Sequence, residues 1–297
     1  MSWEAYKLTF QMQSPLHSGY IKVGNIQQTR LYVTGRMLWG ALTSRITRLI
    51  NSTDYDQIGK SVQDYLRTSY FFPCLDREGN RPVLPEVQDH QPGYRVEYVH
   101  FRASKVERWL ITSYASTAIN KNTFAAEEGS LHEVELISHR FLNNVNENGI
   151  NISAGNPVYL TGVFFLSKDA PDNIKTRWKQ AVESFQVGGE RSYGSGRLSL
   201  IAGPNPTEEL FGCGLILPGD APEISIGKNE PILAHAIASD KLKVRGIIEP
   251  FLGRETSKNG QFGENLSSAK LCWAPGAETL KSGSFIVKEK GIWEALM

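Results

Sequence analysis

One short stretch guides the interpretation of the whole sequence: Val187-Gly188-Gly189-Glu190-Arg191-Ser192-Tyr193-Gly194-Ser195-Gly196-Arg197-Leu198. It holds four glycines and two arginines, and it lies between an expected helix and an apolar strand. Glycine permits a positive φ and a close approach of another backbone, and the planar arginine fork suits phosphate oxygens. The stretch therefore predicts either a loop that lies against a polyanion or a glycine-rich turn whose arginines are merely solvated.

The overall charge is nearly balanced, which excludes a nucleic-acid-binding protein that is basic over its whole surface. Lys and Arg number 32 against 31 Asp and Glu in 297 residues, so contact with a polyanion must come from local clusters. No run approaches the roughly 20 apolar residues that span a bilayer, and the first residues lack the pattern of a signal peptide. Cys74, Cys213 and Cys272 are far apart and form no CxxC motif. We expect reduced thiols in a cytoplasmic protein, with neither a zinc site nor a disulfide framework.

The periodicity of apolar residues predicts an α+β chain. Alternation predicts strands at 6–12, 94–101, 106–113, 131–137, 157–167 and 197–201, with a short one at 29–33. Helical spacing predicts helices at 37–50, 54–66 and 174–185, the last capped by Asp172. Residues 16–25 and 117–123 are expected to be loops, and 66–155 an irregular insertion. Gly203-Pro204 is the expected boundary between a first domain, 1–203, and a mostly β second domain, 204–297.

Three motifs in order carry a resemblance to a known family. They are Ser14-Pro15-Leu16-His17-Ser18-Gly19 with the helix start at 33–42, then Thr117-Ala118-Ile119-Asn120 with 125–132, then the glycine-rich stretch. Together they resemble the RAMP superfamily of CRISPR-associated proteins. The segments 245–255 and 273–276 look like the second domain of the Cas-five-like subunits of type III effector complexes, the Csx-ten and Csm-four groups.

This resemblance implies a fold and a role. The fold is a ferredoxin-like, RNA-recognition-type domain with a glycine-rich loop and an insertion, followed by a second, β-rich domain. The role is to hold the 5′ repeat-derived handle of the crRNA beside the large subunit, next to a backbone RAMP subunit. Target RNA would be contacted only indirectly, because sequence specificity rests on pairing between guide and target.

RNA binding requires donors for phosphate and surfaces for unstacked bases. Basic residues occur in the first loop and helix and in the glycine-rich stretch, and Tyr20, Tyr32 and Tyr193 are candidates for stacking, with half-buried packing as the alternative, favoured for Tyr32. The residues expected to contact RNA are His17, Gly19, Tyr20, Lys22, Asn25, Arg30, Arg36, Arg45, Lys121, Gly188, Gly189, Arg191, Ser192, Tyr193, Gly194, Gly196 and Arg197.

The residues offer little for catalysis. RAMP subunits that cleave target RNA carry an aspartate in the first loop, whereas 16–35 contains no acidic residue and Asn25 stands near that place. An amide neither acts as a general base nor holds a divalent cation as a carboxylate does. His17, with Tyr20 and Lys22 nearby, is the one candidate for metal-free cleavage, against the alternative that it packs on the sheet. No histidine spacing indicates a metal, and the glycine pattern matches neither a Walker loop nor a dinucleotide fingerprint, so we expect no cofactor.

Three hypotheses remain after the sequence alone. The leading one is a non-catalytic subunit that binds the crRNA handle. The second is a metal-free repeat-RNA endoribonuclease that uses His17. The third is a backbone subunit that binds the guide–target duplex.

Overall fold

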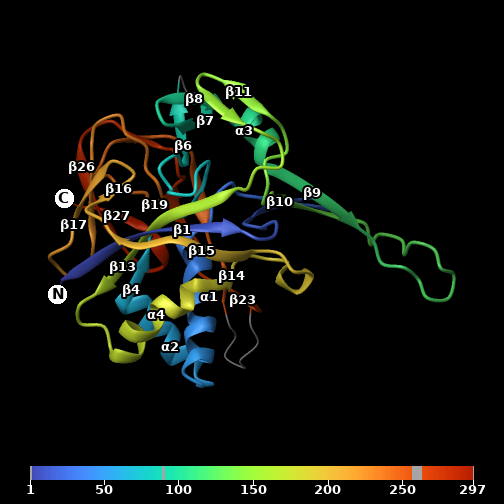
Figure 1. Cartoon of the computed structure of the whole chain (residues 1–297), viewed down its shortest axis with the longest axis horizontal. Coiled ribbons are helices and arrows are strands. Elements are labelled where there is room, and N and C mark those ends of the chain that lie inside the picture. The colour runs from blue at the N-terminus through green and yellow to red at the C-terminus, as the bar shows by residue number, and fades with distance from the viewer. Residues whose placement is uncertain (1, 89–90, 256–262, 297) are drawn as a thin grey trace.

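The computed structural model describes residues 2–88, 91–255 and 263–296 and is built on one antiparallel sheet (Figure 1). The central strands β1 (Trp3–Met12) and β13 (Tyr159–Ser167) pair along nearly their whole length. The sheet order is β14-β15-β1-β13-β4, and β5 pairs with the other end of β13. The outer strands are β4 (Leu66–Thr68), β5 (Phe72–Cys74), β14 (Ser184–Gln186) and β15 (Arg197–Pro206).

Both faces of this sheet are covered, which explains why its central strand β13 is so apolar. On β13, Leu160 and Phe164 belong to the core under the helices, whereas Val163 and Phe165 belong to the core shared with the C-terminal half. Successive side chains of a strand point to opposite faces, so a strand buried on both needs an apolar residue at nearly every position, whereas β1 alternates apolar with polar residues. The predicted strands at 6–12 and 157–167 are confirmed.

Three helices cover one face: α1 (Gly35–Leu49), α2 (Tyr55–Tyr65) and α4 (Asp172–Glu183) (Figure 1). On α1 the buried residues Leu38, Leu42 and Ile46 recur every four positions, as expected for one face of a helix. Asp54 caps α2 by accepting a hydrogen bond from the Gln57 amide. The predicted cap at Asp172 is wrong, because the helix begins there and Pro171 is its N-cap. The carboxylate still favours the first turn through the helix dipole.

The segment between β5 and β13 is more regular than expected. It contains β6 (Val83–Gln88), β7 (Gln91–Val96), β8 (Val99–Arg102), α3 (Ala103–Leu110), β9 (Ile111–Ser116), β10 (His132–Ile137), β11 (Val145–Glu147) and β12 (Ile150–Ile152). Residues 66–74, expected in this insertion, belong to the main sheet. The expected strand at 106–113 is wrong up to Leu110. Val106, Trp109 and Leu110 are buried at helical spacing, which is the pattern of one face of a helix.

The first loop also forms strands. β2 (Gly19–Val23) and β3 (Ile26–Thr29) make a hairpin that continues into β10 and β9 in the order β2-β3-β10-β9. The prediction of a loop at 16–25 is therefore wrong for 19–23. Every residue of β2 is exposed, so no apolar alternation indicated a half-buried strand. The β9–β10 hairpin of this sheet projects from the body as an arm (Figure 1).

The C-terminal third forms a second sheet, in keeping with the mostly β segment that the sequence predicts. This sheet covers the other face of the first. Its order is β16-β17-β18-β26-β27-β19-β24-β21. The strands are β16 (Glu209–Leu210), β17 (Cys213–Ile216), β18 (Glu223–Ile226), β19 (Ala236–Ile237), β21 (Ile248–Phe251), β24 (Lys270–Trp273), β26 (Gly283–Val287) and β27 (Trp293–Ala295). Two short pairs join them, β20 (Val244–Arg245) with β25 (Glu278–Thr279) and β22 (Arg254–Glu255) with β23 (Asn265–Leu266).

The expected domain boundary at Gly203-Pro204 falls inside a strand. β15 runs through these residues to Pro206, and its pairing with β1 shifts register there. The glycine and proline mark an irregularity in the strand, and the chain enters the second sheet only at β16. Within the described residues, no helix is both long and apolar enough to span a bilayer.

A buried ion pair joins the two halves. Glu249 on β21 accepts hydrogen bonds from the Arg30 guanidinium (2.6 Å) and from His235 Nε2 (2.5 Å). His235 is fully buried, and its Nδ1 accepts from the Tyr70 hydroxyl at 2.8 Å. Tyr32 stacks on Tyr70 beside them, with ring centroids 5.7 Å apart. The alternative of packing is thus confirmed for Tyr32.

The surroundings fix the charges of this network. Burial alone would raise the pKa of the Glu249 carboxyl, but the His235 hydrogen bond and the Arg30 charge lower it to about 2. Burial, with the Arg30 charge, lowers the pKa of His235 below its ordinary value. Glu249 is therefore ionised and His235 neutral in the folded protein.

Replacing Glu249 by Gln tests this contact. We expect the variant to lose about 3 kcal/mol of unfolding free energy at pH 7, because Arg30 is left buried without its counter-charge. The pKa of Glu249 rises from about 2 to its ordinary 4.5 on unfolding, so its contribution is complete above pH 4.5. It is lost as the pH falls toward 2, and the parent and the variant should converge over that range in chemical denaturation.

The matched control for Glu249→Gln is Glu97→Gln, which breaks the more exposed Arg81–Glu97 pair. That pair should contribute less than about 1 kcal/mol. Equal effects of the two substitutions, or a gap that does not narrow in acid, would contradict a buried ion pair between the halves.

Candidate nucleic-acid interface

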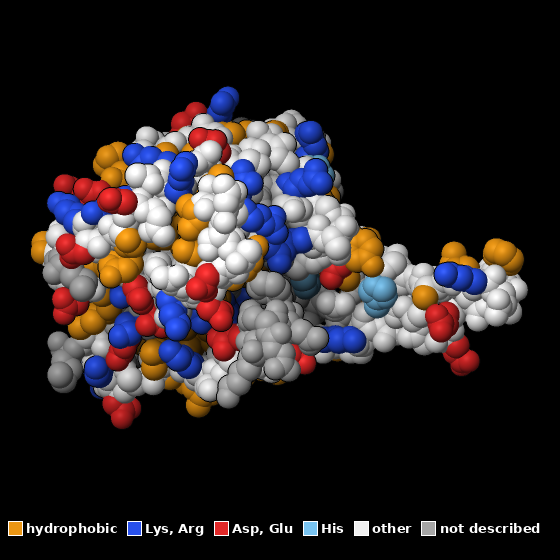
Figure 2. All heavy atoms as spheres, turned by 90° about the horizontal axis from the view of Figure 1, so that it is seen from below, with side chains coloured by type: hydrophobic (Ala, Val, Ile, Leu, Met, Phe, Trp, Pro, Cys, Tyr) orange, Lys and Arg blue, Asp and Glu red, His pale blue; other side chains and the backbone are white. Residues whose placement is uncertain are grey.

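A wide groove lies between the helical layer, the glycine-rich loop and the C-terminal sheet, with a cavity volume of about 1930 Å³. Of the residues that the structure describes, three acidic ones line it: Asp56, Glu190 and Glu255. Ten basic residues in the same described set line it: Lys22, Arg30, Arg36, Arg45, Arg48, Lys60, Arg191, Arg197, Arg254 and Lys290. Figure 2 shows Lys and Arg side chains gathered beside a hollow near the middle of this face. The groove therefore concentrates positive charge in a chain whose net charge is only +1.

The glycine-rich loop forms one wall, and its glycines serve its own geometry. Val187 N donates to Gly196 O at 2.9 Å, which closes the loop. Gly196 has φ +76°, and a Cβ there would lie 1.8 Å from Val187 O. Gly188 has φ +89°, and its Cβ would lie 2.4 Å from His17 O. Larger residues would force both contacts apart.

The loop is clamped onto the segment that follows β1. Gly189 N donates to His17 O at 3.0 Å, and Gly196 N donates to Pro15 O at 2.8 Å. The Ser14 hydroxyl accepts from the Arg197 amide at 3.0 Å. The first and third sequence motifs are thus one structural unit, although about 170 residues separate them in the chain.

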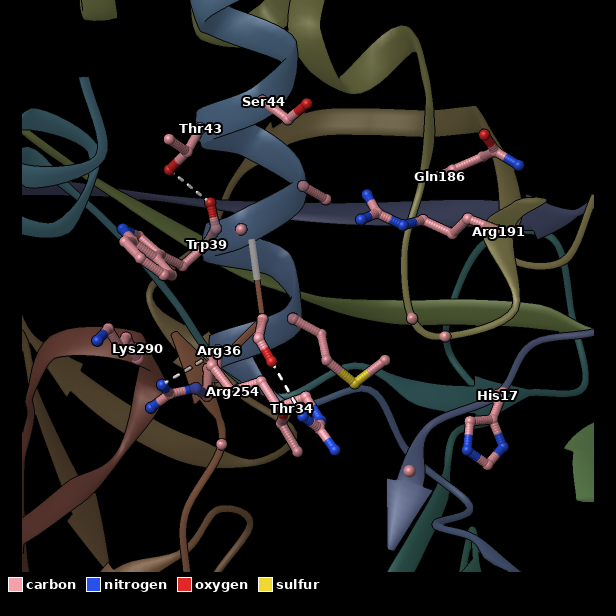
Figure 3. A pocket seen from close by; sticks show the side chains of 18 of the residues that line it. His17, Thr34, Arg36, Trp39, Thr43, Ser44, Gln186, Arg191, Arg254 and Lys290 are labelled. Atoms are coloured by element: carbon pink, nitrogen blue, oxygen red, sulfur yellow. Dashed lines mark hydrogen bonds between the residues drawn. The ribbon is translucent and has the colours of Figure 1, made fainter. Parts of the chain in front are cut away.

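The helical wall and the glycine-rich loop carry cations that have no counter-charge in the described chain. Within the described residues no ion pair is formed by five of them: Arg45 and Arg48 on α1, Lys60 on α2, and Arg191 and Arg197 of the loop. Arg45 Nε is buried without a hydrogen-bond partner there. In Figure 3 the Arg191 side chain reaches from the loop toward α1. These groups are available to an anionic ligand.

Two cations beside the C-terminal wall, Arg36 and Lys290, are already paired. Glu255 accepts from Arg36 at 2.8 Å and from Lys290 at 3.2 Å, and Lys290 Nζ lies 4.5 Å from the centroid of the Trp39 ring. Burial would raise the pKa of Glu255, but these two cations lower it overall. Figure 3 shows Arg36, Arg254 and Lys290 on the same side of the groove. Arg36, expected as a phosphate ligand, thus also joins the two halves.

Arg30 likewise has a structural role that the sequence did not reveal. Besides Glu249, its guanidinium donates to the Tyr32 hydroxyl at 3.0 Å and lies 4.3 Å from the centroid of the Tyr20 ring. The Arg30 side chain is 11 % exposed. Its charge is already balanced within the protein, whereas Tyr20 remains 45 % exposed at the mouth of the groove.

His17 lines the groove but is 6 % exposed. Its Nδ1 lies 2.8 Å from the Glu135 carbonyl oxygen, so Nδ1 carries the proton and donates. Within the described residues, His17 forms no hydrogen bond to Tyr20 or Lys22, the partners expected for catalysis. Its ring is fixed to β10 through Nδ1, and Nε2 has no hydrogen-bond partner in the described part of the chain.

The structure brings twelve of the expected residues to the groove and leaves five outside it. Asn25 is exposed in the β2–β3 turn, and Lys121 lies in the tip of the arm. Gly196 is buried in the closure of the loop. Tyr193 and Gly194 line a smaller, separate cavity. The twelve at the groove are His17, Gly19, Tyr20, Lys22, Arg30, Arg36, Arg45, Gly188, Gly189, Arg191, Ser192 and Arg197.

Several lining residues were not expected. Arg48 lies one turn after Arg45 on the exposed side of α1, a spacing that could have indicated it. Lys60 enters from α2, and Arg254 and Lys290 enter from the C-terminal third. No local pattern marks these three, because their place depends on how the halves pack. Among the residues that the structure describes, no three His, Cys, Asp or Glu side chains are placed to hold a metal ion.

Comparison with known proteins gives a likeness of fold. No family model matches the chain, and no curated protein matches its sequence. A chain in the cryo-EM structure of the type III-B Cmr-beta bound to cognate target RNA and AMPPnP is similar, with TM-score 0.57 and 12% identity. The match covers 92% of this chain and 85% of that one. A chain of Cmr-beta bound to cognate target RNA is similar with TM-score 0.55 and 12% identity, covering 92% and 86%. The chain thus shares its fold, nearly end to end, with a subunit of type III-B Cmr-beta.

Proposed function

We propose that this chain is a non-catalytic RNA-binding subunit of a type III CRISPR effector ribonucleoprotein. It holds the 5′ repeat-derived handle of the crRNA beside the large subunit and next to a backbone RAMP subunit. The groove, with ten basic and three acidic lining residues, is the observation that carries this proposal. The likeness to a Cmr-beta chain supports the setting.

The strand order supports a ferredoxin-like RAMP domain. Along the chain the main sheet follows the order strand, helices, strand, strand, helix, strand: β1, α1 and α2, β4 with β5, β13, α4 and β15. In space the first strand lies between the third and the last. This is the split β-α-β arrangement of that fold class.

The shape of the groove favours a single strand of RNA. Two halves of the protein wall it, and the free cations lie on the helical side at several heights along α1 and α2. Phosphates can follow these cations while bases meet exposed rings such as Tyr20. A repeat-derived handle is a single strand of this kind, whereas a guide–target duplex is stiff and would need a broader cradle.

Reversing two unpaired charges tests RNA binding. In Arg45→Glu/Arg191→Glu we expect affinity for single-stranded RNA to fall more than about tenfold. The slope of log K against log salt should also shrink by about 1.4, because two phosphate contacts of about 0.7 each are lost. Fluorescence anisotropy over a salt series measures both quantities.

The matched control reverses Arg77 and Arg177 instead, two exposed arginines away from the groove. It changes the net charge equally and should leave both affinity and slope near those of the parent. If the two double variants weaken binding to the same extent, the groove is not the RNA site.

Crosslinking within the assembled complex tests the handle. With 4-thiouridine placed in turn along the crRNA, we expect crosslinks to the glycine-rich loop and α1 only from the repeat-derived 5′ segment, because the groove binds that segment. Mass spectrometry of the crosslinked peptides identifies the contacts. Crosslinks from the spacer would favour the backbone subunit instead, and a lack of any crosslink from the 5′ segment would sink the proposal.

A cleavage assay separates this role from the endoribonuclease alternative. The free Nε2 of His17 is the observation that favours that alternative. We expect repeat RNA incubated with the pure protein in EDTA to stay intact, since no second proton-transfer group is hydrogen-bonded to His17 in the described chain. Cleavage by the parent that His17→Ala abolishes would establish the enzyme instead.

A further inference from the structure

The glycine-rich loop also borders a second, smaller cavity of about 350 Å³, which shares no lining residue with the groove among the described residues. Tyr193, Gly194 and Ser195 line this cavity, whereas Glu190, Arg191 and Ser192 line the groove. Consecutive residues of one loop therefore face two different sites. The volume lies at the small end of ordinary ligand sites.

The lining is apolar and aromatic. Tyr193 comes from the loop and Tyr114 from β9, at the base of the arm. Leu136 of β10 and Pro15 supply aliphatic surface, Ser14 and Ser195 add two small polar groups, and no charged residue of the described chain lines the cavity. Such a site does not suit a phosphate, but it suits a flat, weakly polar group that can lie against a ring.

The backbone of Tyr193 and the side chain of Tyr114 are held in place. Tyr193 ends a single turn of 3-10 helix in which its amide donates to Glu190 O at 3.0 Å, and Glu190 and Gly194 on either side have positive φ. The Tyr114 hydroxyl donates to Glu190 Oε2 at 3.1 Å. One residue, Glu190, thus fixes the backbone under one tyrosine and the side chain of the other.

Tyr193 is nevertheless 79 % exposed. An aromatic side chain left in water on a hydrogen-bonded turn, beside a second tyrosine and a basic groove, is the arrangement by which single-stranded nucleic acid is bound through its bases. Covering the ring would remove apolar surface from water at little conformational cost, because the turn is already ordered.

We infer that this cavity is a slot for one unstacked nucleobase of the RNA strand whose phosphates lie in the groove. This inference rests on the proposed function and adds to it a separate base-binding subsite, made by Tyr193 and Tyr114. The strand would leave the groove over Arg191 and Ser192 and turn one base down beside Tyr193. Stacking accepts any base, so the slot would add affinity and fix the register without reading sequence.

The experiment compares two probes on the full chain. One is a labelled oligoadenylate of about ten nucleotides, and the other is an abasic ribose-phosphate oligomer of the same length. We expect Tyr193→Ala to weaken oligoadenylate binding about tenfold and to leave the abasic oligomer unaffected. Tyr193→Phe should retain both affinities, and Tyr114→Leu should weaken oligoadenylate binding alone.

The control is Tyr98→Ala, which removes a fully exposed tyrosine in the β7–β8 turn, away from both cavities. It should change neither affinity. Equal losses for both probes in Tyr193→Ala, or no loss for either, would overturn the slot. If groove charge reversal still weakened the parent's RNA binding in that case, the proposed function would stand without it. If the parent protein bound neither probe, both the slot and the proposed function would be refuted.

Discussion

The ion pair between Arg30 and Glu249 is the contact on which the shape of the groove depends. Arg30 follows the β2–β3 hairpin and Glu249 lies on β21, so their 2.6 Å contact fixes the C-terminal sheet against the first loop. Arg30 and His235 offset the desolvation of the Glu249 carboxylate, and Glu249 in turn balances the charge of Arg30. Removing either would leave an unpaired buried charge between the two walls, so the groove and the junction of the halves share one energetic origin.

The glycine-rich stretch divides two tasks among its residues. Gly188 and Gly196 allow backbone atoms of His17 and Val187 to lie where a Cβ would be, and so lock the loop onto the end of β1. Arg191, Ser192 and Tyr193 are carried outward by the resulting turn. The glycines serve the geometry of the loop, and the polar and aromatic residues serve its surface. A flexible loop with the same side chains would lose entropy on binding that this closed loop has already lost.

The sequence predicted an element well where the element buries one face of regularly spaced apolar residues. It did not predict features that depend on packing between segments far apart in the chain. β1, α1 and α4 were predicted closely, because each must bury one regular set of apolar residues. β2 was missed because it is exposed along its whole length. Arg30 and Arg36 were recognised as important cations, but the acids that pair with them lie more than two hundred residues away. Lys60 and Lys290 could not be assigned to the groove until the two halves were placed together.

The cations of the groove therefore fall into two groups with different physical effects. Arg30, Arg36 and Lys290 are paired with carboxylates and determine where the walls stand. The other seven have no counter-charge in the described chain and supply the field: Lys22, Arg45, Arg48, Lys60, Arg191, Arg197 and Arg254. At physiological ionic strength charges are screened beyond about 8 Å, so cations spread over a surface cannot act together. Gathering seven cations that are unpaired in the described chain into one groove lets a chain of net charge +1 present a local field that attracts anions. Local arrangement, rather than net charge, decides where such a chain can bind a polyanion.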